Sequence, residues 1–199
     1  MFVDIDQGWH APPREHPWTA SVSNAEWRYC NFRENPELIR SSLEDFKLWE
    51  HYSGVPRFYE FLEWMNGTES NFETNDCGLR PPRIDNAPPP VIPFVNPVVI
   101  HSRVTVLFRK LIYNTTADAM DWLCKNIVNC LEGCVPNFPA VIRLSLWPHY
   151  FLAIDKPGNV IEMRIWAWGD TEILAMENFD GAVQSMTGCL KTISPLFKA

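Results

Sequence analysis

The fold of this chain is decided by residues 139–170, which run PAVIRLSLWPHYFLAIDKPGNVIEMRIWAWGD. Two apolar runs flank residues 156–159 (KPGN), and Pro followed by Gly suits the two central positions of a type II turn. The stretch therefore predicts a β-hairpin in which Asp155 pairs with Val160. Two-residue hairpins prefer type I′ or II′ turns, so a slipped register is an open alternative.

Alternation along the two predicted strands sorts their side chains into two faces. In the register set by the turn, Phe151 pairs with Arg164 and His149 with Trp166. Pro148 predicts a bulge or an edge position, because proline cannot donate to the ladder. One face is apolar and is expected to pack on a core: Ile142, Leu144, Leu146, Tyr150, Leu152, Ile154, Ile161, Met163 and Ile165. The other mixes aromatic, cationic and acidic groups: Arg143, Ser145, Trp147, His149, Phe151, Glu162, Arg164, Trp166 and Trp168.

The first half of the chain is expected to be helical and irregular. Asn35 is a favoured N-cap and Pro36 a favoured first helical residue, so they predict a helix that ends before Gly54. A second helix over 56–65 would complete a helical hairpin. Residues 66–97 have no hydrophobic period and many prolines, which predicts a long irregular crossing toward the second half.

The second half predicts the order β-α-β-β-(β)-α. Strand-like alternation covers 98–113, a helical period covers 116–132, and the hairpin follows. A short strand at 173–178 and a final helix at 180–193 complete the order. This order is typical of an α+β protein with an antiparallel or mixed sheet and two helices on one face. The parts 1–97 and 98–199 are expected to pack as one compact unit.

Composition narrows the class of protein. The 199 residues carry a net charge of −7, which argues against a nucleic acid or an anionic membrane as partner and favours a basic protein. No apolar run is long enough to cross a bilayer, and no leader with a basic and then an apolar segment is evident. We therefore expect a cytoplasmic protein. Nine tryptophans and 17 prolines are unusual, and tryptophan is enriched at interaction surfaces.

Familiar catalytic and cofactor motifs are missing from the sequence. There is no glycine-rich phosphate loop, no GxSxG and no HExxH. The cysteines form no CxxC pair and are expected to be reduced core thiols, so we predict neither a metal nor a cofactor. They are Cys30, Cys77, Cys124, Cys130, Cys134 and Cys189.

A polar stretch at 66–80 is the candidate catalytic loop. Its simplest interpretation is a surface loop whose side chains bond to its own backbone. The enzymatic alternative is a hydrolase or transferase. Cys77 would then act as a nucleophile beside His101 or His149, because a nearby imidazole favours the thiolate. Carboxylates next to a guanidinium can instead orient a substrate. The candidates for that role are Glu69, Glu73, Asp76 and Arg80.

The mixed hairpin face is the candidate binding surface. If it is open, a patch rich in Trp and Arg predicts a protein-binding site, because these residues dominate interface energetics. If the N-terminal half covers it, the same residues are core. We favour a non-catalytic binding or accessory protein, for example of the immunity type, that binds a protein partner through this face. Its binding residues would be Arg143, Trp147, His149, Phe151, Arg164, Trp166 and Trp168.

Overall fold

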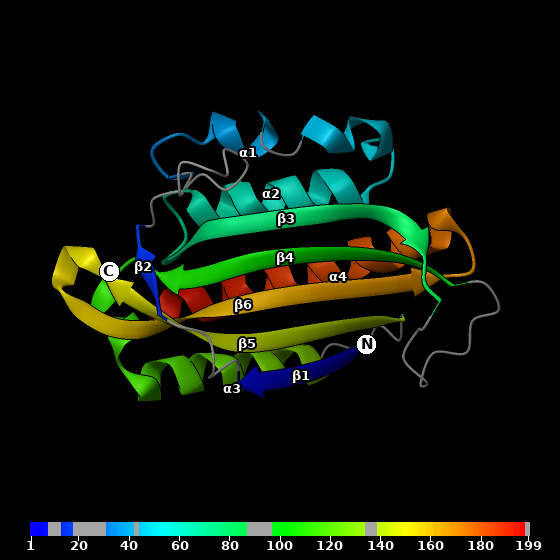
Figure 1. Cartoon of the computed structure of the whole chain (residues 1–199). Coiled ribbons are helices and arrows are strands. Elements are labelled where there is room, and N and C mark those ends of the chain that lie inside the picture. The colour runs from blue at the N-terminus through cyan, green and yellow to red at the C-terminus, as the bar shows by residue number, and fades with distance from the viewer. Residues whose placement is uncertain (8–12, 18–30, 42–43, 87–96, 134–138, 198–199) are drawn as a thin grey trace.

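A computed structural model describes residues 1–7, 13–17, 31–41, 44–86, 97–133 and 139–197. In this described part, six strands form one mixed sheet with the order β1-β5-β6-β4-β3, and β2 also pairs with β5 (Figure 1). β1 and β2 run parallel to β5, and the remaining neighbours are antiparallel. The strands are β1 (Phe2–Gln7), β2 (Arg14–His16), β3 (Phe72–Ile84), β4 (Val98–Phe108), β5 (Ala140–Phe151) and β6 (Lys156–Gly169).

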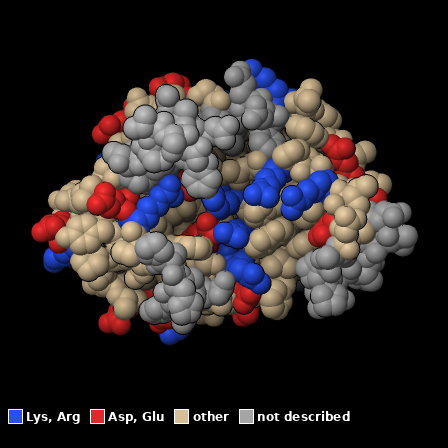
Figure 2. Space-filling model, in the orientation of Figure 1, with Lys and Arg blue, Asp and Glu red and all other residues tan. Residues whose placement is uncertain are grey.

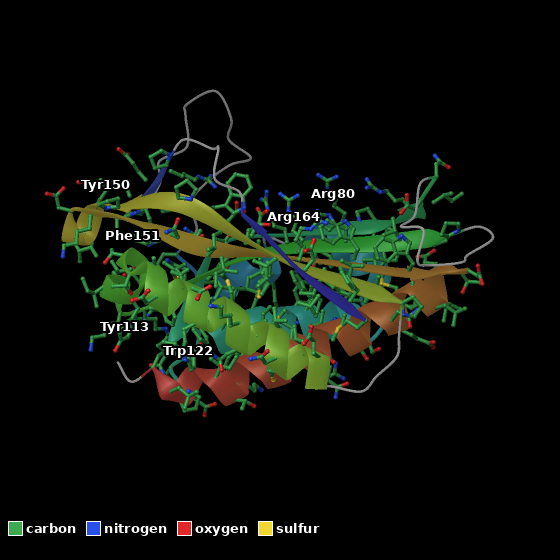
Figure 3. The ribbon with its side chains drawn as sticks, turned by 90° about the horizontal axis from the view of Figure 1, so that it is seen from below. Arg80, Tyr113, Trp122, Tyr150, Phe151 and Arg164 are labelled. Atoms are coloured by element: carbon green, nitrogen blue, oxygen red, sulfur yellow. The ribbon has the colours of Figure 1, made fainter. Side chains whose placement is uncertain are left out.

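The helices pack on one face of this sheet, and arginine side chains such as Arg80 and Arg164 lie on the opposite face (Figure 3). The α-helices are α1 (Glu37–Ser41), α2 (Gly54–Asn66), α3 (Ala117–Gly133) and α4 (Glu172–Ile193), with 3₁₀ turns η1 (Glu44–Trp49), η2 (Leu111–Thr115), η3 (Leu152–Ile154) and η4 (Ser194–Leu196). The predicted α+β class and mixed sheet are confirmed. Strands from both 1–97 and 98–199 belong to the same sheet.

The core lies between the sheet and the helices. Alternate residues of β5 and β6, among them Ile142 and Ile165, are at most 2% exposed. The helices contribute large side chains such as Phe58, Leu123 and Phe179 to the same cluster. The predicted apolar face is confirmed over 142–146 and 161–165. Its outer members do not belong to this cluster: Tyr150 bonds to Asp155, Leu152 is exposed, and Ile154 packs on a smaller cluster.

The predicted hairpin register was wrong. Val160 pairs with Trp147, eight residues before the expected Asp155, and Arg164 pairs with Arg143. Because side chains alternate with a period of two, a slip by an even number of residues leaves both faces unchanged. The pairing partners therefore differ from the prediction, while the division into two faces does not.

The turn explains the error. The hairpin is closed by η3 and by Asp155 in a left-handed conformation, with φ of 52°, and the KPGN segment belongs to β6. Gly158 is not needed for a turn but for a close contact between two backbone segments. A Cβ there would lie 2.3 Å from the backbone oxygen of Asn114, so only glycine allows this close approach.

Pro148 occupies a local gap on the outer edge of β5. β1 pairs with β5 up to Leu146, and β2 pairs with it from His149 onward. The missing N–H of proline thus falls between the two partner strands. The predicted edge position is confirmed.

The predicted irregular crossing is largely a strand. β3 pairs with β4 along the edge of the sheet, with register shifts between Thr74 and Cys77 and between Arg80 and Arg83. The Pro-Pro pair at 81–82 falls within the second shift, where the missing N–H groups cost no ladder bonds. The sequence prediction failed because edge strands tolerate proline. Residues 87–96 lie outside the described part.

The helical hairpin is not confirmed. α1 has only five residues and is followed by η1, while the second predicted helix is present as α2. The strand predicted at 173–178 was wrong, because these residues form the first turns of α4. The Thr171 hydroxyl accepts a hydrogen bond from the Leu174 amide and thereby caps this helix.

Candidate functional site

An arginine row crosses three neighbouring strands on the face opposite the helices. Arg103 of β4 pairs with Arg164 of β6, which in turn pairs with Arg143 of β5. Their side chains are 32%, 36% and 43% exposed. Figure 3 shows Arg80 and Arg164 on the side away from the helices, and Figure 2 shows cationic side chains gathered over this face.

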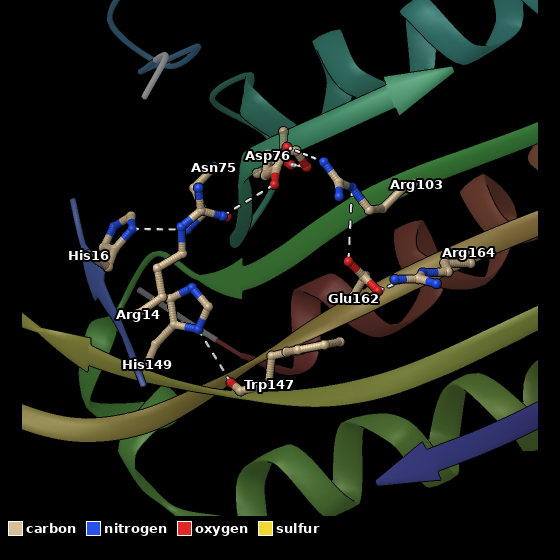
Figure 4. A network of polar contacts seen from close by, with 10 residues as sticks. Arg14, His16, Asn75, Asp76, Arg103, Trp147, His149, Glu162 and Arg164 are labelled. Atoms are coloured by element: carbon tan, nitrogen blue, oxygen red, sulfur yellow. Dashed lines mark hydrogen bonds and ion pairs between the residues drawn. The ribbon is translucent and has the colours of Figure 1, made fainter. Parts of the chain in front are cut away.

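Carboxylates hold the arginine row together. Like charges on adjacent strands repel, so such a row needs opposite charges nearby. Glu162 accepts a hydrogen bond from Arg164 Nε at 2.6 Å and lies 3.9 Å from Arg103 Nε. Asp76 accepts from Arg103 at 2.9 Å, and Figure 4 shows the resulting chain of alternating charges.

The outer end of the row is tied to the N-terminal strand. Arg143 donates from Nε to the Asp4 carboxylate at 3.0 Å. Both side chains are more than a third exposed, so this pair contributes little to stability.

Aromatic rings lie beside the arginine row. The ring of His101 stacks on that of Trp166, with centroids 4.8 Å apart and planes 17° apart. The guanidinium carbon of Arg143 lies 5.8 Å from the centroid of the same tryptophan ring. His101 and Arg143 belong to the strands on either side of Trp166.

His101 is neutral at pH 7. Burial first, and then the neighbouring guanidinium groups with Arg80 foremost, lower its pKa from 6.5 to about 4. Its Nε2 atom is buried and has no hydrogen-bond partner in the described part of the chain. The guanidinium groups near it are those of Arg80, Arg83, Arg103 and Arg164.

A cavity of about 470 Å³ opens where the arginine row meets β2. Charged side chains line one part of it, and Trp147 with two prolines lines another. Its lining is Pro13, Arg14, Asn75, Asp76, Arg103, Thr105, Trp147, Pro148, His149, Val160, Glu162 and Arg164.

Two buried histidines lie where β2 pairs with β5: His16 of β2, and His149 of β5, which lines the cavity. Asn75 Nδ2 lies 3.1 Å from His16 Nδ1, and His149 Nδ1 lies 3.3 Å from the Trp147 carbonyl oxygen. Burial is the main cause that lowers the pKa of each imidazole to about 4; the charge of His149 also lowers the pKa of His16, and that of Arg14 lowers the pKa of His149. Both rings are therefore neutral at pH 7.

The structure separates the candidate catalytic groups. Cys77 pairs with Val104 and packs against the core under the helices, whereas His101 lies on the opposite face with the arginines. His149 lies at the cavity beside β2, away from His101 along the sheet. No nucleophile–base pair is thereby formed between Cys77 and either histidine.

The candidate carboxylates of the 66–80 stretch also lie apart from one another. Glu73 lies 3.7 Å from Arg33, and its pKa is raised mainly by burial. Glu69 is exposed, while Asp76 pairs with Arg103 in the arginine row. Arg80 is exposed on β3 and has no ion pair with another described residue. The predicted loop is thus a strand that contributes Asp76 and Arg80 to the arginine face.

The candidate binding residues divide into three groups. Arg143, Arg164 and Trp166 are half-buried on the arginine face. Trp168 is 3% exposed and donates from Nε1 to Asp85, and Phe151 is fully buried. The remaining two candidates, Trp147 and His149, line the cavity.

Arg103 was missed by the sequence analysis although it lies in the centre of the row. The available signal was alternation in VVIHSRVTV, which places His101, Arg103 and Thr105 on one side of β4. Arg14 and Asp4 could not be found in this way, because they come from short strands whose pairing with β5 is a long-range contact.

Within the described residues, no group of three His, Cys, Asp or Glu side chains is placed to hold a metal ion. In the same part of the chain, no helix has the length and apolar character to cross a membrane. Comparison with family models, curated proteins and solved structures finds no match.

Proposed function

We propose that this chain is a non-catalytic binding protein whose arginine face binds an acidic segment of a protein partner. The observation that carries the proposal is the row Arg103–Arg164–Arg143 on the sheet face opposite the described α-helices. Exposed guanidinium groups on a rigid sheet are suited to bidentate recognition of carboxylates.

The charge of this face differs from that of the whole chain. The net charge of −7 favours a basic partner, and that expectation is untested. Among the described side chains of this face, six arginines stand against four carboxylates, which favours an anionic group locally. The arginines are Arg14, Arg80, Arg83, Arg103, Arg143 and Arg164, and the carboxylates are Asp4, Asp76, Asp85 and Glu162.

The geometry of Trp166 favours a protein over a single-stranded nucleic acid. Sheet surfaces that bind single strands stack bases on free aromatic rings. Here the Trp166 ring is not free, because the His101 ring stacks on it with centroids 4.8 Å apart and the Arg143 guanidinium carbon lies 5.8 Å from its centroid. The ring instead holds the Arg143 guanidinium in place, which preorganises it for an ionic contact.

An acidic peptide tests this proposal. Octaglutamate should bind in a saturable manner at low ionic strength, detected by calorimetry, and Arg143→Glu should weaken binding by about tenfold or more because it removes one cation and adds repulsion. Arg40→Glu is the matched control, because it makes the same charge change on α1, where Arg40 pairs with Glu63. It should change the affinity by less than about twofold.

Three results would contradict the proposal. Octalysine could bind more tightly than octaglutamate, or an oligothymidylate could bind more tightly than both. Equal effects of Arg143→Glu and Arg40→Glu would show that only the overall charge matters.

A further inference from the structure

The cavity beside the arginine row has the size of a small-molecule site. Its volume of about 470 Å³ falls within the range of ligand pockets, which combine apolar walls with a few placed polar groups. Trp147, Pro13 and Pro148 supply the apolar wall, and the polar groups come from β2, β3, β4, β5 and β6. Five strands thus converge on one cavity.

Two buried polar atoms belong to residues that line this cavity. Asn75 is 3% exposed, and its Oδ1 atom has no hydrogen-bond partner among the described residues. Trp147 Nε1 is likewise buried and, within the same part of the chain, unpartnered. A buried donor or acceptor left unpaired costs about 1–3 kcal/mol, so these two atoms are unusual features of the cavity wall.

Among the described residues that line the cavity, the guanidinium groups outnumber the carboxylates by one. Three guanidinium groups, those of Arg14, Arg103 and Arg164, stand against the carboxylates of Asp76 and Glu162. A single monoanion would make the lining neutral, whereas a phosphate dianion would leave an excess of negative charge in a partly buried site.

Arg164 is the best-placed group for an anion. It uses Nε to bond Glu162, and its two terminal nitrogens have no partner among the described residues. A carboxylate matches the spacing of the guanidinium nitrogens and accepts two parallel hydrogen bonds from them. Glu162 meanwhile holds the guanidinium plane in a fixed orientation.

We propose that this cavity binds a small monocarboxylic acid with an apolar body. Its carboxylate lies on the terminal nitrogens of Arg164, and its apolar body lies against Trp147 and Pro148. The inference deepens the proposed function, because it rests on the arginine face being a binding surface. It assigns a free small acid to the cavity and the acidic protein segment to the row beside it.

The test compares two probes of the same shape. 3-Phenylpropionate should bind with a measurable Kd in calorimetry, and the neutral 3-phenylpropionamide should bind about tenfold more weakly or not at all, because it cannot form the charge-assisted pair. In a ¹H–¹⁵N spectrum, the indole N–H of Trp147, assigned with Trp147→Phe, should shift with the acid. Equal affinity for acid and amide, or tighter binding of phenyl phosphate, would overturn the proposal.

Two conservative variants locate the site. Arg164→Lys keeps the charge but loses the fork of donors, so 3-phenylpropionate should bind about tenfold more weakly. Arg143→Lys is the matched control, because Arg143 belongs to the same row but does not line the cavity; its effect should be under about twofold. If both variants behave alike, the acid does not occupy the cavity. Thermal unfolding of each variant shows whether it has kept its fold.

The octaglutamate experiment separates this inference from the proposed function. If 3-phenylpropionate binds and octaglutamate does not, the cavity is a ligand site and the acidic-partner proposal fails. If octaglutamate binds, and 3-phenylpropionate shows no saturable binding at concentrations up to about 10 mM, only the cavity inference fails.

Discussion

The two faces of the same strands make different contributions to this protein. On β5, Ile142 is fully buried under the helices, while its neighbour Arg143 is 43% exposed on the other face. On β6, Ile165 and Arg164 show the same contrast. Burial of apolar area stabilises the fold, whereas a guanidinium that stays near water can still bind an anion. A period of two therefore places a buried core residue and a partly exposed arginine at consecutive positions.

The strongest test of this contrast uses neighbouring residues. Ile142→Ala should destabilise the protein by about 3 kcal/mol, because it removes buried methylenes and leaves a cavity. Arg143→Ala should cost less than about 1 kcal/mol, because its ion pair with Asp4 is exposed. Urea unfolding followed by circular dichroism measures both. Equal losses would show that the arginine face is also core.

The histidines of the cavity predict a dependence of stability on pH. The unfolded chain protonates histidine near pH 6.5, but the pKa of buried His149 is about 4 in the folded protein. The unfolded state thus binds more protons between these values, so stability should fall as the pH drops from 7 toward 4. Protonation linked to His149 should lower the free energy of unfolding by about 2 kcal/mol between pH 7 and pH 4.5.

Replacing one histidine sharpens this prediction. His149→Gln should flatten the dependence of the unfolding free energy on pH, measured by urea titrations at pH 7 and pH 4.5. His51→Gln is the control, because His51 is exposed. A slope that both variants leave unchanged would mean that His149 is not protonated on unfolding.

A smaller effect is expected where η2 approaches β6. Gly158→Ala would place a Cβ 2.3 Å from the Asn114 backbone oxygen, so this segment must shift, at a cost of about 1–3 kcal/mol. Gly78→Ala is the control, because a Cβ there meets no described atom within 4 Å. Thermal unfolding compares the two variants. A Tm for Gly158→Ala equal to that of Gly78→Ala would show that the close approach is absent in solution.

The alternation of apolar and polar residues was enough to predict the two faces of the hairpin strands, but not which residues of β5 and β6 pair. Alternation over 140–146 and 161–168 identified both Ile142 and Arg164 correctly, because each strand alternates whatever its partner. The register depended on the turn, and KPGN imitates a turn while serving in a strand. The role of Gly158 depends on Asn114, more than 40 residues earlier, which local pattern does not show.

The candidate site was predicted in part for the same reason. Arg143, Arg164 and Trp166 lie on one hairpin and were found together, whereas Asp76 and Arg103 meet them only through strand pairing. The prolines of β3 concealed a strand, because an edge position tolerates them.

By itself, the sequence determined the α+β class, the two faces of the hairpin and the concentration of Trp and Arg on one of them. These properties follow from residue type and a period of two, which are local. Only the tertiary structure decided that three arginines lie side by side, that Cys77 is separated from His101 by the sheet, and that β2 completes a cavity. Those facts depend on which distant segments pair, and the long-range hydrogen bonds and apolar contacts that select the pairing form only when the whole chain packs.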